Sequence, residues 1–495
     1  MATRDIKIGL ALLTLAAWAG PARAQNTGAW ATGNGNWETP SIWTTGSVPG
    51  STNNVYIGSA SGTTVPANAA LNATVTLTAN ESAADVYLGY GNTSSGTLNL
   101  GSNTLSVTGT INIGIVGNGG TGSITESGGS FTAGGLYLYS AGSSINSYTF
   151  GAKDVVGSLL VNASTATTSA TGNVTGGAYV EAGGTLNLGA AMNFYGTGIV
   201  DVEGAGSVIN MHGHSIGANA VELGYNGSSA ATIENQGTIS TGNLFLGNGT
   251  TLTMGTSDQA SDLTLATKAT LTTVAVGNLG GNVGVYSGST LNLGATLSVL
   301  GNVDVEDTNS AINANGHGIS SQNLYVGWFD GVAASLNNVG KVTTEGLFVG
   351  FGSSLTLHGG DVVNSSISLT RGSGSTLTVE QVGGTGLMLN GTSLSDLSIG
   401  TGNRMNLIFT SSLTSNWDFA WKDPSANANW ISTLDGMITS GEIKITSADG
   451  YHVFDNGGYT YIAGGAVPEP SSVIMLSLGV LGVAGVMAAR RRRAG

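Results

Sequence analysis

The 495-residue chain contains no cysteine, and only 8% of its residues are charged. The lack of cysteine excludes disulfides, thiolate metal sites and cysteine nucleophiles. Low charge together with 40% hydrophobic residues also excludes a solvated disordered chain, because disorder requires low hydrophobicity and high net charge. Glycine is abundant, with 81 residues, but without a strict three-residue period it does not indicate collagen.

Basic residues are scarce in the body of the chain. Between Gln25 and Ala466, seven basic and 26 acidic side chains give a net charge of −19. Such a body has no cationic surface to neutralise phosphates, so we expect no nucleic-acid partner. Scattered cations also argue against a catalytic groove that combines carboxylates with Arg or Lys. The sequence indicates no cofactor, no metal site and no catalytic residues.

The first 24 residues have the pattern of a secretory signal peptide. Arg4 and Lys7 form a charged start, Ile8 to Ala19 an apolar core, and Ala22 to Ala24 a small-x-small cleavage site. The alternative is a retained membrane helix, which the short apolar core disfavours. The pattern predicts export of the body that follows.

The C-terminal end has an apolar run followed by cations. Val473 to Ala489 is apolar apart from Ser477, which is about the minimum length for a bilayer span. Under the positive-inside rule the next four residues act as a cytoplasmic stop. These four residues are Arg490, Arg491, Arg492 and Arg493. The alternative, a buried core helix, is disfavoured by the adjacent arginines, so we expect a transmembrane helix with the body outside the inner membrane.

A short motif precedes this predicted helix, formed by Val467, Pro468, Glu469 and Pro470. Motif, apolar helix and arginine cluster, in this order at the extreme C-terminus, resemble the PEP-CTERM sorting signal of Gram-negative bacteria that produce exopolysaccharide. The resemblance implies processing by an exosortase, a membrane protease-transpeptidase, near the Pro-Glu-Pro. It also implies an inner-membrane-tethered precursor that is then delivered to the cell surface or extracellular matrix.

The body repeats itself on two scales. Residues 185–224 resemble 290–327, and residues 221–254 resemble 324–357, so a large unit has been duplicated. Within it, short strand-like segments recur every 23 to 25 residues, for example Val86, Ile111 and Leu136 at the start of three of them. Short alternating segments broken by Gly, Asn and Ser are typical of strands. A period of this length fits one coil of a β-solenoid.

We therefore predict an all-β fold, a right-handed parallel β-solenoid of about 23–25 residues per coil, between the signal helix and the transmembrane helix. A globular sandwich is the alternative. The predicted core residues are Val86, Leu88, Ile111, Ile113, Leu136, Leu138, Leu244 and Leu246. Glycines that follow the strands are expected at corners with positive φ, namely Gly89, Gly114, Gly224, Gly247, Gly327 and Gly350. The pattern also resembles the β-strand repeats of autotransporter passengers.

Five segments are predicted along the chain. They are the signal peptide (1–24), an N-terminal cap (25–62), the solenoid (63–403), a C-terminal β-rich module (404–465) and the sorting and anchor segment (466–495). The cap contains Trp30, Trp37 and Trp43, which we interpret as closing the open end of the core rather than as a binding site. In the module, the sequence predicts a short helix around Asn429 to Ser440.

Two polar patterns were weighed as metal sites. His212 and His214 have the spacing of a chelating pair, but surface turn residues are the favoured interpretation. Acidic residues alternate in two repeated segments and suggest calcium ligands, but a solvated outer face is favoured. These residues are Asp201, Glu203, Asp304, Glu306 and Asp307. Thr-x-Thr segments such as Thr74 to Thr78 are not in step along the sequence, which disfavours an ice-binding face.

Aromatic residues recur between the predicted core positions, at Tyr87, Tyr137, Phe245, Tyr325 and Phe348. An aromatic stripe stabilises a sheet through cross-strand contacts, which is the favoured interpretation. The same residues are also candidates for stacking against sugar rings. The sequence as a whole predicts an exported, non-enzymatic structural or adhesive protein associated with exopolysaccharide. The alternative is a polysaccharide lyase or hydrolase on the same scaffold.

Overall fold

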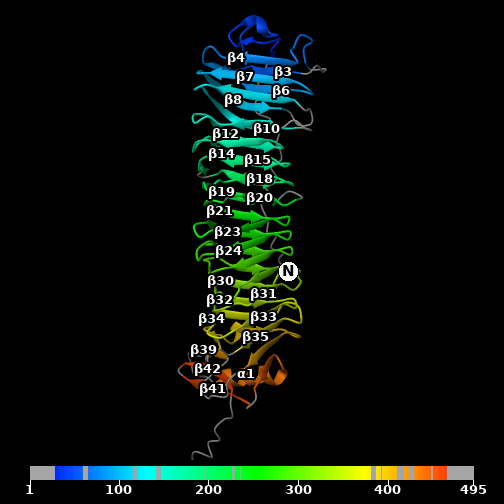
Figure 1. Cartoon of the computed structure of the whole chain (residues 1–495). Coiled ribbons are helices and arrows are strands. Elements are labelled where there is room, and N and C mark those ends of the chain that lie inside the picture. The colour runs from blue at the N-terminus through cyan, green and yellow to red at the C-terminus, as the bar shows by residue number, and fades with distance from the viewer. Residues whose placement is uncertain are drawn as a thin grey trace, which may run out of the picture. The chain divides into compact units, whose positions relative to one another are not determined.

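The computed structural model describes residues 28–464, apart from 60–64, 115–119, 141–145, 195–196, 226–228, 235, 330, 381–385, 392, 410–416, 418, 423–427, 448–449 and 457. The chain forms two compact units, Met1–Met192 and Asn193–Gly495. Each unit is a stack of parallel β-coils, so the predicted all-β parallel solenoid is confirmed (Figure 1).

The first unit has two sets of strands. The first set contains β1 (Gly28–Trp30), β3 (Asn54–Ser59), β5 (Glu81–Ala83), β6 (Asp85–Tyr90), β8 (Thr104–Ile113), β10 (Ser130–Tyr139), β12 (Val155–Asn162) and β14 (Val174–Glu181). The second contains β2 (Gly35–Asn36), β4 (Asn72–Thr76), β7 (Ser95–Gly101), β9 (Thr121–Glu126), β11 (Ser147–Thr149), β13 (Thr165–Thr168) and β15 (Thr185–Leu188). A 3-10 turn, η1, covers Pro40–Ile42, and β16 (Met192–Asn193) lies at the sequence boundary between the units.

The second unit repeats this plan. Its first set contains β17 (Ile199–Glu203), β19 (Ile216–Leu223), β21 (Ile239–Leu246), β23 (Gln259–Leu265), β25 (Val283–Val285), β27 (Leu297–Ser298), β28 (Val303–Val305), β30 (Ile319–Val326), β32 (Val342–Val349), β34 (Val362–Leu369), β36 (Leu387–Leu389), β37 (Leu397–Ile399), β39 (Phe419–Lys422), β41 (Tyr451–Asn456) and β42 (Tyr459–Gly464).

Its second set contains β18 (Val208–Asn210), β20 (Thr232–Glu234), β22 (Thr251–Thr253), β24 (Thr270–Thr273), β26 (Thr290–Leu293), β29 (Ala311–Asn313), β31 (Ser335–Asn337), β33 (Ser354–Leu357), β35 (Thr376–Glu380), β38 (Arg404–Ile408) and β40 (Ile443–Thr446). A 3-10 turn, η2, covers Leu394–Asp396. The helix α1 (Ala428–Ser440) confirms the helix predicted around residues 429–440.

The core consists of the inward side chains of successive coils. All eight predicted core residues are at most 1% exposed, from Val86 in β6 to Leu246 in β21. Parallel pairing places the apolar side chains of one strand next to those of the following coil, for example Val221 of β19 opposite Leu244 of β21. Burying each Val, Leu or Ile side chain contributes about 1.5–3 kcal/mol, so this column of apolar residues is the main stabilising element.

Coil length varies more than the predicted 23–25 residues. Val86 pairs with Ile111, 25 positions later. However, Leu159 pairs with Ala178 only 19 positions later. The strands stay in register while the turns between them change length, because surface loops tolerate insertions at low free-energy cost.

Four of the six predicted corner glycines have positive φ. Gly89 has a φ of 70° and Gly224 of 60°, with Gly114 and Gly327 similar. The prediction is wrong for Gly247 and Gly350, where the next residue, Asn248 or Phe351, takes the positive φ instead. Glycine is still required there, because a Cβ on Gly247 would lie 2.8 Å from the carbonyl oxygen of Gly224.

Aromatic residues are buried near both ends of the described chain. In the first unit, Trp37 and Trp43 are at most 2% exposed and pack edge to face at 5.3 Å. In the second unit, the fully buried Trp421 of β39 packs against Trp430 of α1 at 4.5 Å. Parallel pairing continues beyond residue 403, where β38 pairs with β35 and β40 with β38. Antiparallel pairing of β39 with β42 then ends the stack, which keeps a parallel edge from remaining open.

Candidate functional site

An aromatic cluster lies on the outer side of β30 and β32. The register places Tyr325 opposite Phe348, and their rings stack at 4.7 Å with an interplanar angle of 16°. Phe329 contacts Tyr325 at 5.1 Å, and Trp328 contacts Phe348 at 5.3 Å. The structure thus brings together two of the predicted stacking residues and adds two neighbours from the loop after β30.

Arg371 completes this cluster from the loop after β34. Its guanidinium carbon lies 5.1 Å from the ring centre of Trp328 and 5.4 Å from that of Phe329, within the range of cation–π contacts. Its Nη1 also donates to the carbonyl oxygen of Trp328 at 3.3 Å. Phe329 is 46% exposed, so the cluster presents an aromatic face to solvent. Aromatic faces of this kind bind apolar faces and cations.

Glu306, in the coil that precedes this cluster, holds the loop that carries Trp328 and Phe329. Its carboxylate accepts the backbone N–H groups of Trp328 at 2.7 Å and Phe329 at 3.1 Å. The side chain is only 1% exposed, so the prediction that Glu306 lies on a solvated outer face is wrong. Charge-assisted hydrogen bonds from two successive N–H groups explain how the burial is tolerated. The other four residues of the predicted acidic rows, Asp201, Glu203, Asp304 and Asp307, are partly exposed.

The other predicted stacking residues lie in separate groups. In the first unit, Tyr87 stacks on Tyr56 at 4.6 Å, and Tyr56 stacks on Trp30 at 3.8 Å. Asn112 lies between Tyr87 and Tyr137 in the register, so the stripe is interrupted there. Burial, followed by the nearby Asp85 charge, raises the pKa of Tyr87, so its hydroxyl stays protonated. In the second unit, Phe245 contacts Tyr225 at 5.0 Å.

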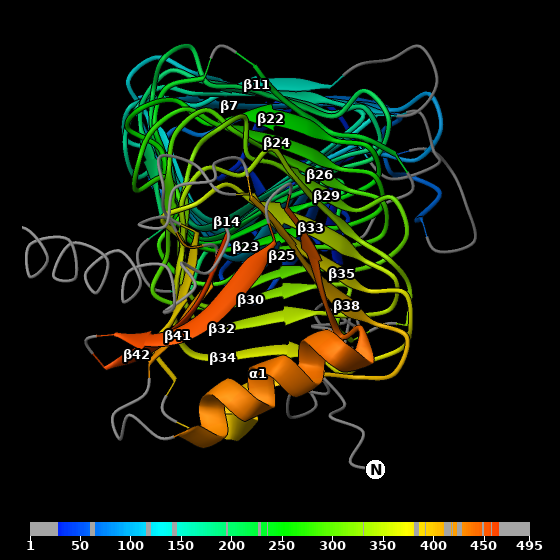
Figure 2. The same cartoon turned by 90° about the horizontal axis from the view of Figure 1, so that it is seen from below.

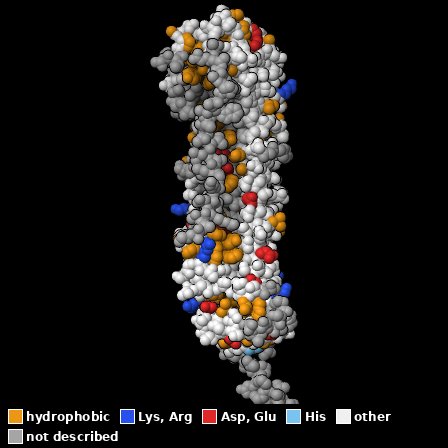
Figure 3. All heavy atoms as spheres, turned by 180° about the vertical axis from the view of Figure 1, so that it is seen from behind, with side chains coloured by type: hydrophobic (Ala, Val, Ile, Leu, Met, Phe, Trp, Pro, Cys, Tyr) orange, Lys and Arg blue, Asp and Glu red, His pale blue; other side chains and the backbone are white. Residues whose placement is uncertain are grey.

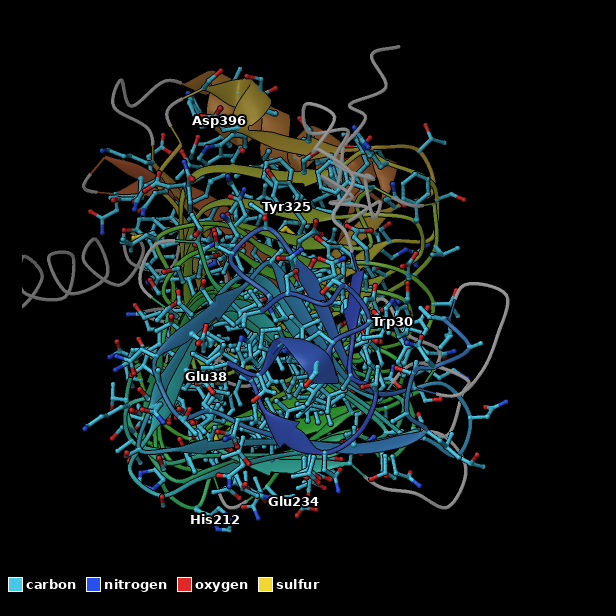
Figure 4. All side chains as sticks on the ribbon, turned by 90° about the horizontal axis from the view of Figure 1, so that it is seen from above. Trp30, Glu38, His212, Glu234, Tyr325 and Asp396 are labelled. Atoms are coloured by element: carbon cyan, nitrogen blue, oxygen red, sulfur yellow. The ribbon has the colours of Figure 1, made fainter. Side chains whose placement is uncertain are left out.

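The His212 and His214 pair lies in a surface turn. His212 has a φ of 47°, and the His214 N–H donates to the carbonyl oxygen of Met211 at 2.8 Å. Figure 4 shows His212 at the outer margin of the ribbon, on the same side as Glu234. Within the part of the chain that the structure describes, no three His, Cys, Asp or Glu residues are grouped so as to hold a metal ion.

A set of buried aspartates at the coil corners was not predicted from the sequence. The Asp258 carboxylate, 1% exposed, accepts the N–H groups of Ile239 and Gly255, both at 2.7 Å. Asp154 accepts the equivalent N–H groups of Phe131 at 3.0 Å and Gly151 at 2.7 Å. A sequence signal exists, because each aspartate follows a glycine by three positions. Each aspartate fixes a turn to the preceding coil and is therefore structural.

One of these corners also holds a second carboxyl group. Tyr148 donates its hydroxyl to Asp154 at 2.5 Å and lies 3.5 Å from Glu126. Burial, and then the charge of Asp154, raises the pKa of Glu126 from 4.5 to about 7. A carboxyl with a raised pKa beside a second carboxyl resembles an acid–base pair. However, Asp154 is 1% exposed and already bonded to three groups of the protein, so it has no access to a substrate.

The Glu126 pKa predicts a pH-dependent stability. Because the folded-state pKa is raised, the stabilisation is complete below about pH 4.5 and is lost as the pH rises through about 7. We expect the melting temperature to fall by several degrees between pH 5 and pH 8, measured by circular dichroism. Glu126→Gln should remove part of this slope, whereas Glu234→Gln, an exposed control, should keep it. An unchanged slope in Glu126→Gln would contradict the assignment.

The surface carries few charges between these features. Figure 3 shows scattered acidic and basic side chains on one face, with most of the described surface formed by uncharged polar side chains and backbone. His358 Nδ1 lies 3.2 Å from a carboxylate oxygen of Glu380 on this surface. A surface of this composition suits contact with neutral or hydroxyl-rich partners better than long-range electrostatic capture.

Comparison with known proteins identifies the C-terminal signal. Residues 466–493 match the PEP-CTERM protein-sorting motif, which confirms the resemblance carried by Pro468, Glu469 and Pro470. No curated protein and no solved structure matches the chain. The motif marks an exported protein of Gram-negative bacteria that is membrane-anchored before cleavage and sorted by an exosortase.

The predicted membrane segments lie outside the described residues. These are the signal peptide (1–24), the sorting residues Val467 to Pro470, the apolar run from Val473 and the arginines Arg490 to Arg493. Within the described ranges, no helix is both long and apolar enough to cross a bilayer.

Proposed function

We propose that the protein is a non-enzymatic component of the cell surface or extracellular matrix, where it binds exopolysaccharide. The sorting motif supports delivery to that compartment. The observation that carries the binding proposal is the aromatic cluster of the second unit, in which Phe329 is exposed, Tyr325 and Phe348 are half-buried and Trp328 is buried beneath them. Sugar rings have apolar faces that pack on aromatic rings, so the cluster offers a platform for a polysaccharide.

Three features support a binding role rather than a purely structural ladder. Phe329 is 46% exposed, although an aromatic ladder that only stabilised the sheet would be covered by its neighbours. Arg371 holds the cluster from the side and supplies donors for sugar hydroxyls. Glu306 accepts two backbone N–H groups of the loop after β30, so the rings of Trp328 and Phe329 are held in place before a ligand binds.

The alternative, a polysaccharide-degrading enzyme, has weaker support. The close carboxyl pair of Glu126 and Asp154 is the observation that favours it. Glycoside hydrolases need two carboxyls that flank a substrate bond. Because Asp154 is buried and bonded within the protein, we favour the non-enzymatic proposal.

The proposal is tested by removing the exposed ring. Phe329→Ala is expected to weaken retention of the full-length protein on the host's exopolysaccharide by about tenfold, since stacking contacts at hot spots contribute roughly 1–3 kcal/mol. Retention is measured by co-sedimentation with purified polymer. Leu300→Ala, which removes a large apolar side chain that is 92% exposed and lies outside the cluster, is the control. Equal retention of wild type and Phe329→Ala would refute the role of the cluster.

A further inference from the structure

The second sheet of the second unit carries two continuous ranks of uncharged side chains, all of them polar except Ala311. The first rank contains Thr251, Thr270, Thr290, Ala311, Ser335, Ser354 and Thr376. The second contains Thr253, Thr272, Asn292, Asn313, Asn337, Thr356 and Thr378. All fourteen face solvent at least in part. The strands that carry them pair in parallel, with β31 joined to β33 through Ser335 and Ser354. Two Thr-x-Thr segments pair in register between β22 and β24, but Asn, Ala or Ser takes one or both places in the next coils, so the sheet has no regular Thr-x-Thr ladder.

The ranks end at a cationic cavity. Register continues from Thr376 to Arg404 and from Asn406 to Lys444, so cations follow the uncharged side chains on the last two strands. Arg404 and Lys444 line one cavity of about 410 Å³, together with Tyr451 and an apolar part formed by Ile438, Ile443 and Ile445. The helix α1 contacts β40 and β41, the strands that carry Lys444 and Tyr451 (Figure 2).

The two cations are available to a ligand. Both side chains are exposed, and neither forms an ion pair with another described residue. Glu442 adjoins Ile443 in sequence but does not line the cavity. The ring of Tyr451 is 38% exposed and forms part of the cavity wall. Two cations beside an aromatic ring fit a sugar that carries a carboxylate, and a cavity of this volume has the usual size for a small ligand.

The twist of the second sheet distinguishes between two classes of ligand, a flat lattice such as ice and a flexible polymer chain. Figure 2 shows that the strands from β22 to β38 turn progressively about the long direction of the stack. A rigid plane such as ice cannot follow this turn, whereas a polymer chain can. Neighbouring strands are about 4.8 Å apart, close to the length of one sugar ring. A chain running across the strands therefore meets a new pair of uncharged side chains per ring, and each pair offers two hydroxyl or amide groups except at Ala311.

We propose that this surface binds an acidic polysaccharide, with its neutral stretch on the two ranks and a uronate carboxylate held by Arg404 and Lys444. The inference rests on the proposed function and names its substrate class. The absence of charge along fourteen rank positions explains how a body of net charge −19 accepts an anionic polymer at one end. It also predicts that binding weakens as salt screens the two cations.

The experiment measures binding of the full-length protein to polygalacturonate and to neutral dextran. Replacing both cations (Arg404→Gln with Lys444→Gln) is expected to weaken polygalacturonate binding at least tenfold and leave dextran binding unchanged. The matched control, Lys153→Gln with Lys268→Gln, removes two exposed positive charges elsewhere and should bind as wild type. Thr378→Tyr, on the rank beside the cavity, should weaken polymer binding but spare binding of free galacturonate.

The outcomes separate this inference from the broader proposal. If both double variants bind polygalacturonate equally, the cationic cavity is refuted, while retention on the host polymer through Phe329 is unaffected. If Thr378→Tyr binds the polymer as tightly as the wild type does, the proposal that the polymer lies along the two ranks is refuted. If the wild type binds dextran and polygalacturonate with the same affinity and the same salt dependence, the acidic class is refuted. Loss of host-polymer retention in Phe329→Ala alone supports the aromatic cluster and does not bear on the cavity.

Discussion

Replacing Pro468, Glu469 and Pro470 together by alanine is expected to abolish release of the protein from the inner membrane. The motif lies in residues 466–493 and implies processing by an exosortase, so we expect cleavage to depend on these three residues. Without it, we expect the apolar run from Val473 and the four arginines to remain attached and to keep the precursor in the membrane. We expect extracellular protein to fall below detection, with intact precursor in the membrane fraction, as measured by mass spectrometry of both fractions.

A neighbouring substitution supplies the control for this prediction. Ser471→Ala with Ser472→Ala changes two residues directly after the motif and leaves the Pro-Glu-Pro intact, so release should continue. In the wild type, peptides containing Arg490 to Arg493 should be missing from extracellular protein. An extracellular pool that keeps this arginine terminus would contradict processing, whatever the behaviour of the variants.

The core of the fold could be predicted from the sequence because its signal is local. Val86 and Leu88 alternate with an outward residue, and the same triplet recurs at Ile111 and at Leu136. Alternation specifies which face is buried, and recurrence specifies stacking. The structure confirms both, with these residues at most 1% exposed. The helix α1 was predictable for a similar reason, since its segment lacks the alternating pattern.

Contacts between coils were harder to predict because turn lengths differ. From Leu159 to Ala178 a coil takes 19 residues, and from Ile367 to Leu397 it takes 30. An alignment of coils with a fixed period is therefore out of register after a few coils. For this reason the two ranks of the second sheet could not be predicted from the sequence. The prediction for Glu306 was wrong because the alternating pattern gives the direction of side chains only within a strand. Its carboxylate bends back to two N–H groups of the next coil, after β28 has ended.

The candidate site was only partly predictable. Tyr325 and Phe348 were found from their positions between core residues, and the structure stacks them. Trp328, Phe329 and Arg371 lie in loops without periodicity, so no pattern pointed to them. The Arg404 and Lys444 cavity was missed because the two cations are 40 positions apart and meet only through the pairing of β38 with β40.

Asn278→Ala is expected to destabilise the second unit by about 4 kcal/mol. The Asn278 side chain is 2% exposed and makes four hydrogen bonds with backbone groups. Its Oδ1 accepts the N–H groups of Val274 at 3.1 Å and Ala275 at 2.8 Å. Its Nδ2 donates to the backbone carbonyl oxygens of Gly255 at 2.9 Å and Asp258 at 2.7 Å. Alanine leaves these groups without partners, and each unsatisfied buried group costs about 1–3 kcal/mol, reduced where water enters.

The loss should be local as well as large. In a solenoid each coil contacts only its neighbours, so the backbone from Gly255 to Asn278 should lose hydrogen-exchange protection first. Asn313→Ala is the control, because that amide exchanges hydrogen bonds of 2.9 Å only with Asn292 and Asn337 on the outer face. It should cost less than about 1 kcal/mol. Equal losses in the two variants would show that corner asparagines stabilise the stack no more than those of the outer ranks. A larger loss at Asn278 assigns the stability of the coil to its buried corner, which leaves the outer ranks free to vary with the ligand.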